Sequence, residues 1–457
     1  MGLTRVFDIA RRSLATYQNA MDVTSHNIAN AGNADYSRQR VIFAAENPEA
    51  NANFVWGAGV KIQQVQRVRD TLTDTQIRIN NSKNANYNKQ SELLSQVEEI
   101  FSEPSDIGLS SLMSEFFTSW NELASSPNSL PLRDQVVSNA SQLASKVKSI
   151  HDDIDLVKTD IMNEFRQDVD SVNSMLNQIQ SLNKQIFETK TIGNQPNDLE
   201  DQRDTLIDQL SKLVNISVNT DSQGTPNISI GGISAADLSI ARQFKFDIQG
   251  GKLLLVADDG TKTIALSGGE MSALSDLYST TLPGYQDKLD TLIETMVKNV
   301  NDLHKTGYDL QDPPVTGTDF FSSYSAANGK LTINPAIVAD SRLIAASADG
   351  TSGNGDIATA IYNIMDTKSA DLDGSTLPEY YAELVSEVGN RKKSADMNAE
   401  SSQMVIDQLN QTKASYSGVS TDEEMTNIIK FQRSYDASAK LIQVADDMLK
   451  TLINLVQ

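Results

Sequence analysis

Hydrophobic residues recur every three or four positions at both ends of the chain. The N-terminal seam comprises Phe7, Ala10, Leu14, Tyr17, Met21, Thr24 and Ile28. The C-terminal seam comprises Ile428, Phe431, Tyr435, Ser438, Ile442, Ala445, Leu449, Leu452 and Val456. Each spacing predicts an amphipathic helix, and Ser420 and Glu423 form a capping-box pair at the start of the second one. The matching periods predict that the two terminal helices pair as a coiled coil.

Four further helices are predicted between these ends. The longest carries a heptad-like stripe of Leu143, Val147, Ile150, Ile154, Val157, Ile161, Phe165, Val169, Val172, Leu176, Ile179 and Ile186. A shorter helix before it presents an aromatic face with Phe116 and Trp120. A helix with Asn197 as its cap and another that begins at LPGYQDKLD follow later in the chain. The middle of the chain is therefore predicted to be mostly helical.

The apolar period changes to two between about residues 215 and 267. The alternation runs through segments such as PNISIGG and QFKFDIQGGKLLLVADDG, which carry GG and DDG turns. This pattern predicts a β-meander. Because helical patterns stand on both sides of it, we expect the strands to be an insertion.

The predicted fold class is mainly α with an inserted β-rich domain. We expect a terminal α-helical coiled-coil, a long helical-bundle rod and a small β-domain. The coiled-coil domain is assigned to residues 1–70 with 400–457, the rod to residues 71–213 with 268–399, and the β-rich outer domain to residues 214–267.

The net charge of −22 is unevenly distributed over the 457 residues. Residues 1–40 hold five basic and three acidic side chains, and residues 401–457 hold five basic and seven acidic ones, so the two ends together are neutral. Nucleic acid and anionic membranes bind basic surfaces, so this balance argues against both as partners. Because the ends carry no net charge, several copies of the chain can pack through them without strong repulsion, while the acidic bodies keep the copies soluble.

The chain contains no cysteine, which excludes disulfides and thiolate metal sites. The first dozen residues have no apolar run of the kind found in a secretory signal. No apolar run approaches the roughly 18 residues of a membrane span. Composition alone indicates a cytosolic protein.

The sequence shows no catalytic constellation. His26, His151 and His304 stand apart from one another and from any HExxH motif, so no zinc site is predicted. His304 is expected to be structural, near a helix C-terminus where a cation is favoured, and His151 is expected to be exposed. Pairs of neighbouring carboxylates, such as Asp152 with Asp153, lie on polar helix faces, where a solvated surface explains them as well as acid–base catalysis does. We expect no enzyme activity and no cofactor.

The stretch NIANAGNADYSRQR, residues 27–40, ends the first helix in asparagine, alanine and glycine. One interpretation is a frayed helix end followed by a linker. The other is that Asn27 and Asn30, three residues apart, present their amides to the backbone of a neighbouring chain. Both interpretations follow from the residues.

The stretch ATYQNAMDVTSHNIANAGNADYSRQR resembles the N-terminal signature of bacterial flagellar axial proteins, the rod, hook and hook-associated families. The segment GVSTDEEMTNIIKFQRSYDASAKLIQVADDMLKTLINLV resembles their C-terminal signature, in the form found in the hook-associated protein 1 (FlgK) family. Three internal segments, which begin at GLSSLMSEFF, PNDLEDQRD and LPGYQDKLD, are similar to that family specifically. One departure is Asn33-Ala34-Asp35 in the N-terminal motif loop, although Tyr36, Arg38 and Gln39 are kept.

The resemblance implies a structural protein of the extracellular flagellum at the junction between hook and filament, exported through the flagellum's own type III channel. The implied partners are further copies in a ring, the hook protein, the next hook-associated junction protein, and a cytosolic export chaperone at the C-terminal helix. The alternatives are another axial protein of the hook or rod, or an enzyme carried on an axial scaffold. The predicted assembly interface comprises Phe7, Leu14, Tyr17, Met21, Asn27, Ile28, Asn30, Tyr36, Arg38, Ile428, Phe431, Tyr435, Ile442, Leu449, Leu452 and Val456.

Overall fold

The chain packs into two compact units in the computed structural model, which describes residues 2–51, 54–101, 107–221, 224–258, 260 and 262–456. Unit 1 comprises residues 1–83, 171–244 and 401–457, and unit 2 comprises residues 84–170 and 245–400. Three long helices contribute to both units, because the division falls within them: α2 (Thr71–Phe101), α4 (Leu130–Thr191) and α10 (Leu377–Ser417). These units are defined by packing, and the three domains assigned from the sequence stay a prediction.

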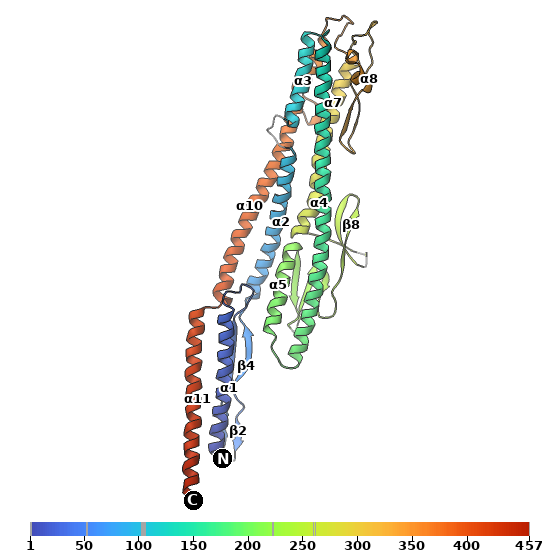
Figure 1. Cartoon of the computed structure of the whole chain (residues 1–457). Helices are drawn as coiled ribbons and strands as arrows, with labels where there is room; N and C mark the ends of the chain where they lie inside the picture. Colours follow the sequence, from blue (N-terminus) through green and yellow to red (C-terminus); the bar gives the residue numbers. More distant parts are fainter. Residues whose placement is uncertain are drawn as a thin grey trace. The chain divides into compact units, whose positions relative to one another are not determined.

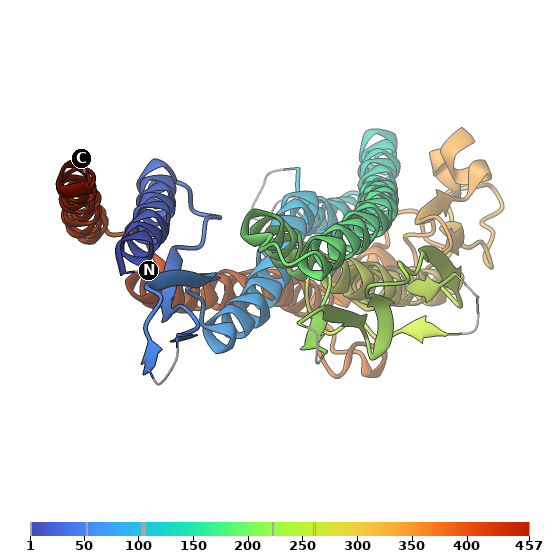
Figure 2. The ribbon, with the colours of Figure 1, turned by 90° about the horizontal axis from the view of Figure 1, so that it is seen from below.

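The two terminal helices of unit 1, α1 (Gly2–Ala29) and α11 (Thr421–Val456), lie side by side (Figure 1, Figure 2). The rings of Tyr17 and Phe431 stack with their centroids 6.4 Å apart, and Phe43 packs on Phe431 at 5.7 Å. The predicted pairing of the terminal seams is confirmed.

A ribbon of strands follows α1 and packs on it. Its strands are β1 (Gln39–Ala45), β2 (Glu49–Asn51), β3 (Phe54–Trp56) and β4 (Val60–Arg67). β1 pairs antiparallel with β4, so that Gln39 stands opposite Arg67. The hydroxyl of Thr16 on α1 donates to the carbonyl of Val60 at 3.1 Å. The sequence pattern did not predict this ribbon, because its strands are short, half-buried and irregular in their alternation.

Unit 1 also contains a helix and a three-stranded sheet: α5 (Asn197–Leu213), β5 (Ile216–Thr220), β6 (Pro226–Ile230) and β7 (Ile233–Ala236). The helix confirms the prediction, but the assignment of Asn197 as its cap is wrong. Pro196 precedes the first turn without a side-chain cap, and the Asn197 amide donates instead to Gln39 Oε1 and to the carbonyl of Val65, each at 3.1 Å.

Unit 2 holds the remaining elements. Its helices other than α2, α4 and α10 are α3 (Leu109–Ser125), α6 (Glu270–Asp276), the π-helical η1 (Leu277–Thr281), α7 (Leu282–His304), α8 (Pro335–Ala339), η2 (Ser341–Leu343), α9 (Asp356–Tyr362), η3 (Asn363–Asp366) and η4 (Ala370–Leu372). Its strands are β8 (Phe244–Gln249), β9 (Lys252–Ala257), β10 (Thr263–Ile264), β11 (Phe321–Ser325) and β12 (Lys330–Ile333). Phe116, Trp120 and Phe320 are fully buried, which confirms the predicted aromatic face of α3 as core.

The two histidines of unit 2 both lie in the core. His304 is fully buried; its Nδ1 lies 2.7 Å from the carbonyl of Thr318, and its Nε2 accepts from the N–H of Ala345 at 2.9 Å. Burial lowers the pKa of His304 to about 4, so the ring is neutral; its role is structural, as expected, but it places no cation at the helix end. His151 is only 2 % exposed and bonds Asp290 through Nε2 at 2.8 Å, so the expectation that it is exposed is also wrong.

The predicted β-meander is not continuous. β5, β6 and β7 form one three-stranded sheet, and β8, β9 and β10 form another. Phe244 begins β8 at the point where the chain passes from unit 1 to unit 2. The alternation along the sequence could not reveal this break, because both sheets share the same period.

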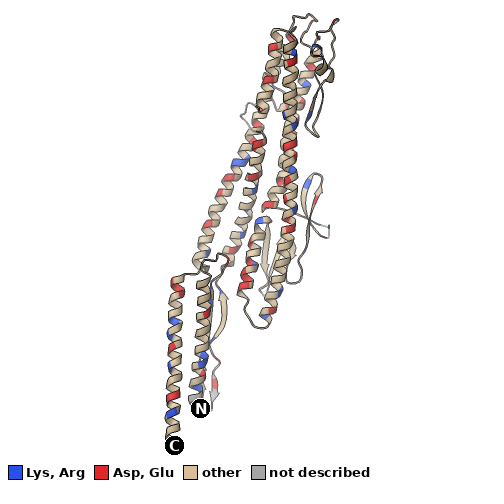
Figure 3. Cartoon of the chain, viewed as in Figure 1, with Lys and Arg blue, Asp and Glu red and all other residues tan. Residues whose placement is uncertain are grey.

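Charged side chains of both signs are distributed along α1 and α11 (Figure 3). This mixture agrees with the neutral sum of the two ends. No helix among the described residues is long and apolar enough to span a membrane.

Candidate functional site

The site begins at the last turns of α1, where Asn27 is 1 % exposed. Its Oδ1 accepts from the hydroxyl of Tyr36 at 2.7 Å and from the N–H of Gln39 at 2.9 Å. Its Nδ2 donates to the carbonyl of Gln39 at 2.8 Å and to Glu424 Oε2 at 3.1 Å. Every donor and acceptor of this amide is therefore used inside one chain.

The hypothesis that Asn27 keeps its amide free for a neighbouring chain is wrong for this reason. A free amide at this position would leave buried groups of Gln39 and Glu424 without partners, at a cost of about 1–3 kcal/mol. Asn30 differs from Asn27, because its Nδ2 donates to the carbonyl of His26 at 3.0 Å on an exposed surface. Asn30 therefore supports the helix end, and its role in assembly stays a prediction.

Residues 36–39 form an extended segment whose successive side chains reach two different partners. Tyr36 bonds Asn27 of α1, and Arg38 bonds Glu423 and Glu424 at the start of α11, with Nη1 and Nη2 distances of 2.9 and 2.6 Å. Ser37 and Gln39 point to α5 instead, as described below. The period of two is that of a strand, so the segment joins the terminal helix pair on one side to α5 on the other. We call residues 36–39 the signature clasp.

Two residues of the signature clasp bind α5. Asp201 accepts from the N–H of Ser37 at 3.0 Å and from its hydroxyl at 2.7 Å. Gln39 Nε2 donates to Asp198 at 3.1 Å. Burial first, and then the charges of nearby acidic residues, raise the pKa of Tyr36, so its hydroxyl stays protonated and remains a donor.

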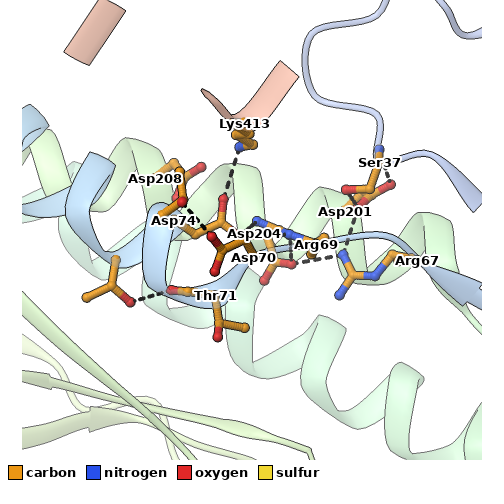
Figure 4. A network of polar contacts seen from close by, with 12 residues as sticks. Ser37, Arg67, Arg69, Asp70, Thr71, Asp74, Asp201, Asp204, Asp208 and Lys413 are labelled. Atoms are coloured by element: carbon orange, nitrogen blue, oxygen red, sulfur yellow. Dashed lines mark hydrogen bonds and ion pairs between the residues drawn. The ribbon is translucent and has the colours of Figure 1, made fainter. Parts of the chain in front are cut away.

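A buried cluster of charges continues this contact along α5 (Figure 4). Arg67 at the end of β4 bonds Glu200, Asp201 and Asp204 at 2.8, 2.7 and 2.9 Å. Arg69 also bonds Asp204. Burial alone would lower the pKa of Arg67, but Asp204 and Glu200 raise it overall, so this guanidinium is charged and paired.

The same cluster holds the start of α2 and the end of α10. Asp74 in the first turn of α2 accepts from Arg69 at 2.7 Å and from Lys413 of α10 at 3.2 Å. Arg78, one turn further on, bonds Asp208 of α5 at 2.5 Å. Charge-assisted bonds thus fix four elements, β4, α2, α5 and α10, to one another.

The predicted seam residues are distributed along α1 and α11. Those that are half-buried are Phe7, Leu14, Tyr17, Met21, Ile28, Ile428, Phe431, Tyr435 and Ile442. Leu449 and Leu452 are 37 % and 49 % exposed, and the side chain of Val456 lies outside the described part of the structure. The structure brings Tyr17 and Phe431 together, as well as Asn27, Tyr36 and Arg38. Their use as an assembly interface stays a prediction.

The sequence patterns did not identify Asp198 and Asp201, the α5 residues that bind the signature clasp, or Asp204, which binds Arg67 and Arg69 beside it. A signal was present, because Ser37 and Gln39 alternate with Tyr36 and Arg38 in a segment without helical periodicity. Their partners on α5 stand about 160 residues away and match a solvated acidic helix face equally well. The described residues contain no group of three or more His, Asp or Glu side chains placed to hold a metal ion.

Paired terminal helices, a clasp after the first helix and a body of long helices agree with the class to which two family matches assign the chain, the flagellar axial proteins. The family described as flagellar hook-associated protein FlgK helical domain matches residues 94–321, and the family described as flagellar basal body rod FlgEFG protein C-terminal matches residues 411–455. The chain belongs to the flagellar hook-associated protein 1 family, and it is a structural protein of the bacterial flagellum of the hook–filament junction class.

Relatives align over nearly the whole length. Flagellar hook-associated protein 1 of Bacillus subtilis is 30% identical, with 98% of this chain and 97% of that protein aligned. The protein of the same name from Escherichia coli is 24% identical over 99% of this chain and all of its own length. The solved structure of the flagellar hook junction protein FlgK from Burkholderia pseudomallei covers 75% of this chain, with a TM-score of 0.63 and 15% identity, and supports the fold.

Proposed function

We propose that copies of this chain form a ring between hook and filament, and that they associate through α1 and α11. The observation that carries the proposal is the outer face of α11. Leu441, Val444 and Met448 recur at helical spacing on α11 and are 48 %, 50 % and 55 % exposed. An apolar stripe of this length on a paired helix marks an association surface, because a further helix that packs on it removes apolar area from water.

The partners that we propose are the hook protein on one side of the ring and the next hook-associated junction protein on the other. In this proposal the chain leaves the cell through the flagellum's own type III channel. The same outer stripe would be exposed in the cytosol before export, so we propose that an export chaperone covers α11 there.

A deletion strain tests the place of the protein in the flagellum. We expect hooks of normal curvature that carry no filament, with filament subunits released into the medium, and we expect plasmid-borne wild type to restore filaments. Absence of the hook itself would point to a hook or rod protein instead. Normal filaments in the deletion strain would contradict the proposal.

A further inference from the structure

A cleft of about 1070 Å³ opens in unit 1 beside the charged cluster. Its walls come from β4, the first turns of α2, the α4–α5 connection, α5, and the ends of β5 and β6 that face each other. The basic side chains in these walls are Arg67, Arg69, Arg78, Lys190 and Arg203, and the acidic ones are Asp74, Glu200 and Asp204. Asp201 and Asp208 pair with Arg67 and Arg78 from behind these walls, so five cations face five anions, and any capacity for a further anion lies in a cation that is not fully paired.

Arg203 is the member of this set with unused hydrogen-bond donors. It is 5 % exposed, and neither its Nε nor its Nη1 has a hydrogen-bond partner among the described residues. Its Nη2 lies 3.3 Å from Asp204 Oδ1, and the other oxygen of Asp204 is taken by Arg67 and Arg69. Three guanidinium groups therefore share one carboxylate, and Arg203 has the weakest hold on it.

The missing hydrogen-bond partners of Arg203 stand out because of its position on α5. Ile207, Leu210 and Val214 continue the same helix face and are buried in the core. An apolar side chain at residue 203 would extend that face without leaving a charge unpaired. Burial lowers the pKa of Arg203, which reflects the same cost of a desolvated charge.

We propose that this cleft binds a carboxylate group and that Arg203 is its anchor. A guanidinium presents a planar set of donors that matches a carboxylate, and two buried donors of Arg203 lack a partner, so a carboxylate pairs with them once the Arg203 side chain turns toward the cleft. Lys190, whose side chain is 41 % exposed, provides a second cation at the cleft. The carboxylate comes either from a small dicarboxylate or from an acidic side chain of a second copy, since each copy carries many exposed carboxylates. The carboxylate site itself does not depend on the proposed place of the chain in the flagellum.

The test uses the full-length monomer and succinate as the probe. At constant ionic strength, replacement of chloride by succinate should raise the melting temperature of the wild type by several degrees, because a ligand that binds only the folded state stabilises it. Arg203→Gln should abolish this shift. Arg342→Gln is the matched control: it removes an exposed arginine that pairs with Asp340 in unit 2, and it should keep the shift.

Arg203→Gln should also melt, without succinate, at or above the temperature of the wild type, because it removes an under-paired buried charge. If this variant fails to fold, Arg203→Lys serves in its place; it keeps the charge without the planar fork and should lose most of the shift. No succinate-specific shift in the wild type, or a shift that survives in Arg203→Gln or Arg203→Lys, would overturn the proposal.

A second arm identifies the source of the carboxylate. If a second copy supplies it, succinate should inhibit polymerisation of the wild type in a sedimentation assay, and Arg203→Gln should polymerise poorly with or without succinate. If a small dicarboxylate supplies it, polymerisation should be insensitive to succinate and to the substitution, while the thermal shift remains.

Discussion

Asn27 of α1 and Glu424 of α11 are joined by a hydrogen bond of 3.1 Å from Nδ2 to Oε2, and both side chains are buried. Arg38 bonds the other oxygen of Glu424 at 2.6 Å. The end of the first helix and the start of the last helix are therefore locked together within one chain. This lock explains why the first helix gives way to a loop: the loop returns alongside the helix and brings Tyr36 and Gln39 back to Asn27.

Asn27→Asp should destabilise the monomer. The substitution replaces the donor to Glu424 with a second carboxylate and leaves buried groups of Gln39 and Glu424 without partners. We expect a loss of about 1–3 kcal/mol in the free energy of unfolding, measured by urea denaturation. Asn30→Ala is the control and should change it by less than about 0.5 kcal/mol, because Asn30 lies on the surface. Equal effects of the two variants would contradict an intrachain role for Asn27.

The charged cluster should make unit 1 sensitive to acid. Burial alone would raise the pKa of Asp204, but Arg69, Arg203 and Arg67 hold it below its ordinary value. The folded state then binds fewer protons than the unfolded state, so the stabilisation is present above about pH 4 and is lost as the pH falls further. Melting temperatures between pH 7 and pH 3 should fall steeply below pH 4 in the wild type and less steeply in Asp204→Asn. Asp8→Asn, an exposed change on α1, should keep the steep fall.

His304 should lower the stability of unit 2 in a different pH range. Its pKa of about 4 in the folded state lies below the ordinary value of 6.5. The unfolded state therefore takes up a proton first, and stability is lost as the pH falls from about 6.5 to about 4, on the order of 3 kcal/mol in total. In NMR spectra of the three histidines, the His304 ring signals should stay constant between pH 8 and pH 5. A His304 titration midpoint near pH 6.5 would contradict the buried neutral ring.

The outer stripe of α11 should serve both assembly and chaperone binding. Leu441→Asp combined with Met448→Asp places two charges on the stripe at positions that are about half exposed in the monomer. We expect loss of filament attachment in cells and loss of co-purification with the export chaperone. Gln443→Asp combined with Thr451→Asp adds the same charge at exposed polar positions of α11 and should leave both intact. Unchanged assembly in the stripe variant would place the association surface elsewhere.

Much of the fold could be predicted from the sequence, because helix periodicity is a local signal. Tyr17 and Phe431 meet because their seams have the same period, and α4 follows from one long stripe. The signature clasp could not be predicted in the same way. Asp201 and Ser37 are distant in sequence. The sequence pattern of a carboxylate on a helix face is the same whether the carboxylate faces water or a buried hydroxyl. His151 was misjudged for a similar reason: a polar ring one position beyond the seam is buried because Asp290 and Tyr324 satisfy it.

The signature clasp closes within one chain, and a disulfide cross-link between Ser37 and Asp201 tests this closure. The chain has no cysteine of its own, so Ser37→Cys combined with Asp201→Cys places one thiol on the clasp and one on α5, where the native side chains meet at 2.7 Å. Flagella assembled from this variant should be oxidised and separated on a non-reducing gel. We expect a single band of monomer mass, shifted by an internal bridge that reductant removes. A ladder of dimers and larger multimers would show instead that the clasp joins neighbouring copies.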